Sequence, residues 1–119
     1  MPKMYFAEFE RTVPPYDVFD KFGHTGNNDA MVRLNRIVEE YPEFKVRVLA
    51  AVYHHEIEFC KGVEEAFKAM YPKNFWLEEK ISGVTEIVKL ESETRNDIIT
   101  KLRALNEKTK KELFSENRS

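Results

Sequence analysis

The chain has 119 residues, of which 42% are hydrophobic and 34% are charged, and its formal net charge is −2. This length and composition are typical of one folded domain that needs no disulfide or metal for stability, and they exclude a disordered chain. The small acidic excess argues against a protein dedicated to nucleic acid or anionic membranes, because both classes normally carry a basic excess.

The cysteine content and the apolar stretches predict the compartment. Cys60 is the single cysteine and cannot form an internal disulfide, which is typical of a reducing compartment. The N-terminus lacks the apolar core of a signal peptide. The longest apolar stretch covers residues 48–53, far short of the roughly 20 residues that span a membrane. We therefore expect a cytoplasmic protein that does not enter membranes.

The first aromatic segment, residues 4–9, alternates poorly between apolar and polar side chains. It could be a short edge strand, but no second strand candidate is evident and an isolated strand is unstable. We expect an extended arm that packs its rings on helices. Pro14 and Pro15 then predict a short helical turn that ends at Gly23. The apolar side of this turn would carry Tyr16, Phe19 and Phe22.

Three further helices are expected in the front of the chain. Asn28 or Asp29 would cap a helix to about Glu40, in which apolar residues recur at helical spacing. Pro42 suits the first position of a second helix that runs to about Met70. A short helix would follow over residues 74–81, with Trp76 where helices meet.

The last tract, residues 84–119, contains no Gly or Pro and one aromatic residue, Phe114. Seven consecutive polar residues, Glu91–Asp97, leave two alternatives. The helix could run through them, or it could break and restart with Thr94 as the cap. We favour the continuous helix, because Gly and Pro are absent.

These elements predict an all-α fold. It would be a compact bundle of about four helices with a long C-terminal helix and an N-terminal extended arm. Residues 1–83 would form the aromatic-rich core, and residues 84–119 would form the long helix of the same domain and act as an oligomerisation arm.

One pair of residues has the spacing of metal ligands. His54 and Glu58 are four apart and would share one face of the expected helix. Helical metal sites need matching ligands from a second helix, and none is evident; His24 falls in an expected loop. We expect both side chains to face solvent, with no metal, no cofactor and no catalytic residues. A helical metal-binding protein or enzyme that uses His54 and Glu58 is kept as an alternative.

Two features point weakly to nucleic acid. Gly23 and Gly26 frame a Gly-x-x-Gly sequence, which in KH modules clamps a nucleic-acid backbone. Here its two middle residues are not basic, and the strands that surround such a loop in a KH module are not predicted. The lysines at 108, 110 and 111 are interleaved with glutamates, which is typical of a solvated helix end. A nucleic-acid-associated helical module is therefore a second alternative. Cys60 lies on the apolar side of its expected helix, which indicates a buried structural thiol.

The breaker-free tract leads to the favoured function. Its later apolar residues either pack on the domain's own helices or cover a surface of a partner protein or a second copy, and we favour the intermolecular contact. We expect a non-enzymatic protein–protein interaction module, such as an adaptor, an inhibitor or a regulatory subunit, that forms a homodimer through the C-terminal helix. The expected interaction residues are Ile98, Leu102, Leu105 and Leu113.

Overall fold

The computed structural model describes residues 2–26, 30–71, 87–88 and 90–116. It has a mixed α/β fold, so the expectation of an all-α bundle is wrong. In chain order the elements are β1 (Lys3–Arg11), β2 (Val18–Thr25), α1 (Ala30–Glu40), β3 (Phe44–Tyr53), α2 (Ile57–Met70), β4 (Ile87–Val88) and α3 (Ser92–Glu116). No helix among these described residues is long and apolar enough to cross a membrane.

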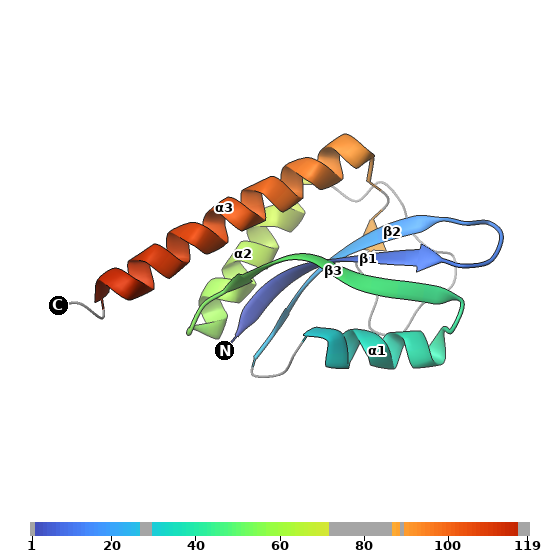
Figure 1. The fold of residues 1–119 in the computed structure, drawn as a ribbon, viewed down its shortest axis with the longest axis horizontal. Coiled ribbons are helices and arrows are strands. Elements are labelled where there is room, and N and C mark those ends of the chain that lie inside the picture. The colour runs from blue at the N-terminus through green and yellow to red at the C-terminus, as the bar shows by residue number, and fades with distance from the viewer. Residues whose placement is uncertain (1, 27–29, 72–86, 89, 117–119) are drawn as a thin grey trace.

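The strands form one antiparallel sheet in the order β3-β1-β2-β4. Figure 1 shows this sheet from its side, with α1 below it and with α2 and α3 above it. The fold therefore has three layers, and each face of the sheet buries an apolar cluster.

The first aromatic segment is the strand β1, which has β3 on one side and β2 on the other. Tyr5, Ala7 and Phe9 face α1, whereas Met4 and Phe6 face α2 and α3. A strand covered on both faces needs apolar residues at successive positions, so it shows no clear alternation. The extended arm expected here is therefore wrong.

The helical turn expected after Pro15 is also wrong, because Val18–Thr25 forms β2. Phe19 and Phe22 lie on opposite faces of the sheet. Gly23 does not end a helix; it pairs with Tyr5 across the sheet. A Cβ atom at Gly23 would overlap the ring of Tyr5, so the glycine makes room for a buried aromatic side chain.

The long helix expected from Pro42 to Met70 is replaced by β3, a short turn and α2. A β-bulge explains why the apolar residues of this strand have a spacing typical of a helix. The pairing of β3 with β1 shifts by one residue, so that Val48 pairs with Ala7 and Ala50 pairs with Phe6. The extra residue, Leu49, changes which face the later residues occupy and creates a spacing of three that imitates a helix.

The helix expected up to Glu40 is confirmed as α1, while its expected caps and the helix over residues 74–81 lie outside the described residues. The last helix begins at Ser92 rather than at Val84, and Ile87–Val88 pairs with β2. The continuous helix is therefore wrong in its first part. The alternative, a break followed by a new helix capped by Thr94, agrees better with the structure, although the helix starts two residues before Thr94.

The largest apolar cluster joins α2 and α3 to the sheet. Ile98 and Leu102 of α3 are completely buried in it, beside side chains of all three long strands. Its other fully or nearly buried members are Met4, Phe6, Phe22, Ala50, Val52, Cys60 and Phe67.

Candidate functional site

β3 is an edge strand of the sheet, with β1 on one side and no described strand on the other (Figure 1). Thr12 donates its backbone N–H to the carbonyl of Glu43 over 2.7 Å, so these two residues form a hydrogen-bonded pair next to the pairing of β1 with β3. Bonded and non-bonded pairs alternate along antiparallel strands. Phe44, Val46 and Val48 therefore turn their backbone N–H and C=O groups away from β1.

Only part of this edge is open. The bulge at Leu49 interrupts it, and beyond the bulge the backbone N–H of Tyr53 donates to Oδ1 of Asn106 on α3 over 3.1 Å. At its start, the N–H of Phe44 donates to the carbonyl of Tyr41. Residues 44–48 remain, and we call them the open edge. The outward N–H groups of its two valines have no partner among the described residues.

The side chains of the open edge separate by chemistry. Val46 and Val48 lie on the α1 side and are half-buried against the core there. Lys45 and Arg47 lie on the other side and are exposed. The Arg47 side chain is 70% exposed, although its Nε donates to Oε1 of Glu8 over 2.9 Å. One side of the open edge is thus apolar, and the other carries two basic side chains, of which Arg47 is also paired with Glu8.

An apolar loop lies at the end of the sheet where β3 begins. Residues 12–17, which we call the hairpin tip, join β1 to β2. Tyr16 is 69% exposed and Val13 is 47% exposed, so two large apolar side chains of this one loop face solvent. The backbone N–H and the hydroxyl of Thr12 both donate to the carbonyl of Glu43, immediately before β3. The hairpin tip therefore lies at the end of the sheet where the open edge begins, on the β1 side of β3.

A buried charge cluster lies under the start of α3. Arg95 donates to both carboxylate oxygens of Asp20 over 3.0 Å each and lies 3.4 Å from Glu8. Glu8 and Asp20 are direct cross-strand neighbours, and Arg47 pairs with Glu8 from β3. Burial raises the pKa of Asp20 to about 6, against the opposing hydrogen bond and charge of Arg95.

This cluster holds the start of α3 against the sheet. Asp20 is completely buried, and both of its oxygens are occupied by Arg95. Two carboxylates directly opposite each other on adjacent strands repel, so the two arginines are needed to balance them. The arrangement ties β1, β2, β3 and α3 together.

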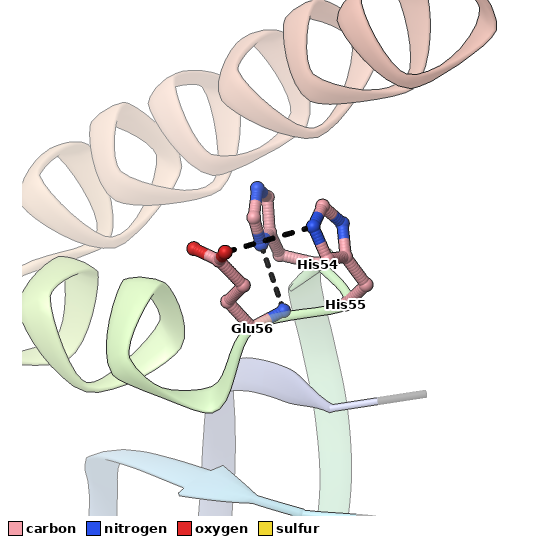
Figure 2. A group of neighbouring side chains, drawn as sticks. All are labelled: His54, His55 and Glu56. Atoms are coloured by element: carbon pink, nitrogen blue, oxygen red, sulfur yellow. Dashed lines mark hydrogen bonds and ion pairs between the residues drawn. The ribbon is translucent and has the colours of Figure 1, made fainter. Parts of the chain in front are cut away.

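The pair His54 and Glu58 is not placed on one helix. His54 follows the end of β3, whereas Glu58 lies in the first turn of α2 with its carboxylate 3.4 Å from Nζ of Lys61. Ligand atoms of His54, His55 and Glu56 instead lie within 4.8 Å of one another. Figure 2 shows these three side chains together in the turn before α2.

The hydrogen bonding of this turn does not resemble a built metal site. Nδ1 of His54 accepts the backbone N–H of Glu56 over 3.0 Å. A ligating histidine normally donates its second N–H to an acceptor, which is the opposite arrangement. His54 also stacks on Phe59, with ring centroids 4.1 Å apart. The turn is better explained as packing at the start of α2.

The same turn gives a stability prediction. Glu56 is the N-cap of α2, has extended backbone angles and makes no side-chain cap hydrogen bond. Replacing it with serine should raise the free energy of unfolding by roughly 0.5–1 kcal/mol, because the hydroxyl can accept an open backbone N–H. Urea unfolding checks this result. Glu56→Ala, which removes the charge without adding a cap, should show no such gain.

The other candidate residues do not converge on a site. Cys60 is completely buried, and burial raises the pKa of its thiol, so it stays protonated. Gly23 belongs to β2, and Gly26 directly follows that strand rather than lying between helices. His24 pairs with Glu64 over 3.2 Å. Lys108, Lys110 and Lys111 are exposed on α3, and Nζ of Lys110 is 3.8 Å from Glu107.

The expected interaction residues of α3 pack within their own chain. Ile98 and Leu102 are completely buried, and Leu105 is half-buried against the same cluster. The side chain of Leu113 lies outside the described residues. The apolar face of α3 is therefore covered by the sheet and α2.

Comparisons of the chain with protein-family models, curated proteins and solved structures gave no match. The candidate surface was not predicted from the sequence. The alternation Phe-Lys-Val-Arg-Val at residues 44–48 was the available signal for a strand with one apolar and one basic side.

Proposed function

We propose that this protein is a non-enzymatic protein–protein interaction module, acting as an adaptor, an inhibitor or a regulatory subunit. Its docking surface is the hairpin tip together with the open edge. The observation that carries the proposal is the exposure of Tyr16 and Val13 at the same end of the sheet as a strand whose outward backbone groups lack described partners. Tyrosine is enriched among the residues that dominate binding energy at protein interfaces.

The chemistry of the buried polar groups also favours binding over catalysis. Asp20 and Glu8 are held by arginines, and Cys60 is enclosed by apolar side chains. A catalytic acid, base or thiol needs access to substrate and a neighbouring group that activates it. Within the described residues, these three groups have neither.

Self-association through α3 is less favoured by this packing. It would withdraw Ile98 and Leu102 from the core of their own chain. Loss of one such buried leucine contact typically costs roughly 2–5 kcal/mol. The proposal therefore places the docking surface at the hairpin tip and the open edge, which are already exposed.

The test uses a tagged full-length chain in a lysate of the organism that encodes it, with bound proteins quantified by mass spectrometry. Tyr16→Ser should reduce recovery of a specific partner at least tenfold, because it removes an exposed aromatic anchor. Val32→Ser is the matched control, since Val32 is 48% exposed and belongs to α1 rather than to the hairpin tip.

The control variant should retain the partner. Equal recovery by the wild type and Tyr16→Ser, or equal loss with Tyr16→Ser and Val32→Ser, would contradict the assignment of the docking surface. Circular dichroism of each variant verifies that the fold is intact.

A further inference from the structure

Resting on the proposed function, we infer that the partner supplies an extended segment that pairs with the open edge as an added strand. This segment alternates acidic and apolar side chains. The backbone provides the first argument. Val46 and Val48 each turn an N–H and a C=O away from β1, and no described residue forms a hydrogen bond with these outward groups. Strand addition satisfies such groups with main-chain hydrogen bonds.

The side chains of the open edge define the chemistry of the added strand. Successive side chains of a strand point to opposite faces, so alternate residues of the partner would lie beside Val46 and Val48. The residues between them would lie beside Lys45 and Arg47. Opposite charges on neighbouring strands attract, and apolar pairs exclude water. The acidic residues therefore face the basic side, and the apolar residues face the α1 side.

A second copy of the chain fits this edge less well. Antiparallel pairing of two open edges about Val46 would place Lys45 of each copy opposite Arg47 of the other. Like charges directly opposite each other are destabilising. Registers shifted toward the end of β3 meet the bulge at Leu49 and the Tyr53 N–H that Asn106 already binds. The basic pair thus disfavours self-pairing and favours an acidic segment.

The length of the open edge limits the docked segment. Five residues of strand span about 16 Å, so about five or six partner residues can pair. The hairpin tip lies at the start of this edge, because Thr12 bonds to Glu43. Strand pairing would set the register, and the exposed hairpin tip would add an apolar contact at that end of the sheet.

The probe is a six-residue peptide that alternates glutamate and valine, titrated into the isotopically labelled full-length chain. A matched peptide carries lysine in place of glutamate. Amide chemical shifts should change most at Val46 and Val48, and these two amides should exchange more slowly with solvent. The acidic peptide should bind at least tenfold more tightly than the basic one.

Val46→Pro isolates the backbone contribution. The β1 ladder uses the N–H groups of Lys45 and Arg47, so proline at position 46 removes only an outward donor. This variant should bind the acidic peptide at least tenfold more weakly, whereas Val46→Ala, which keeps the N–H, should retain most of the binding.

Lys45→Glu tests the charge without altering the backbone and serves if the proline variant does not fold. With one acidic and one basic side chain left on that side, this variant should lose most of the preference for the acidic peptide. Equal binding of both peptides by the wild-type chain, or shift changes away from residues 44–48, would overturn the inference. Concentration-dependent shifts at Val46 and Val48 without peptide would also overturn it, in favour of a second copy. The proposed function would still stand if the wild-type chain captured a partner that Tyr16→Ser does not.

Discussion

Replacing Leu102 with alanine should lower the free energy of unfolding by about 3 kcal/mol. Leu102 is completely buried between α3 and the sheet, and removal of its methyl groups would leave a cavity in the larger core cluster. Urea unfolding monitored by circular dichroism measures the change. Leu102→Glu should be more severe still, because it buries a carboxylate without a partner.

Arg103→Ala is the matched control, since Arg103 is the next residue on α3 and its side chain is exposed. Its effect should stay within about 0.5 kcal/mol. An unchanged unfolding midpoint for Leu102→Ala, combined with conversion of a dimer to a monomer in light scattering, would contradict the packing of α3. It would restore the self-association expected from the sequence.

Replacing Arg95 with methionine should lower the free energy of unfolding by about 3 kcal/mol at pH 8. The substitution leaves Asp20 charged and buried without its bidentate partner, and breaking a buried ion pair is strongly destabilising. Part of this loss should be recovered at pH 5. A buried carboxyl that has lost its arginine avoids the penalty by binding a proton.

The sign of this pH dependence follows from Asp20. Its folded-state pKa of about 6 lies above the ordinary value of 3.8, so its contribution to stability is full below pH 3.8 and is lost as the pH rises through 6. Between pH 5 and pH 8 the wild-type protein should lose about 1 kcal/mol from this group. Arg95→Met should lose more, since Arg95 holds the pKa of Asp20 down.

The double variant Asp20→Asn with Arg95→Met provides the control. It removes both charged partners, so at pH 8 it should be more stable than Arg95→Met alone. Its stability should also change less between pH 5 and pH 8. An equal loss of stability for Arg95→Met at both pH values would show that the charge of Asp20 is not the cause.

The sequence predicted α1 well because one side of that helix packs on the sheet and its opposite side is exposed to solvent. Its buried Leu34 and Ile37 are three residues apart, and polar residues separate them. A one-sided helix has a clear period, which is the strongest local signal of secondary structure.

The strands were missed for physical reasons that differ from one strand to the next. β1 is covered on both faces, so its aromatic residues do not alternate with polar ones. β2 carries Asp20 and Lys21 in its buried middle, where a local pattern predicts apolar residues. The charge of Asp20 is balanced by Arg95, 75 residues away, which no local pattern can show.

The candidate surface was equally hidden from sequence reasoning. Val13 and Tyr16 acquire their meaning from a hairpin that the expected helical turn excluded. The open edge depends on which strand lies outermost in the sheet, and strand order is set by tertiary packing. Only the alternation in residues 44–48 was visible locally, and the bulge at Leu49 ended it after five residues.

Hydrogen exchange of the Val46 and Val48 amides tests the central claim most directly. It should be measured in the free protein and in complex with the partner whose capture depends on Tyr16. Strand addition predicts that both amides become strongly protected in the complex, while the N–H of Tyr53, already bonded to Asn106, changes little. Unchanged exchange of Val46 and Val48 on complex formation would contradict docking at the open edge.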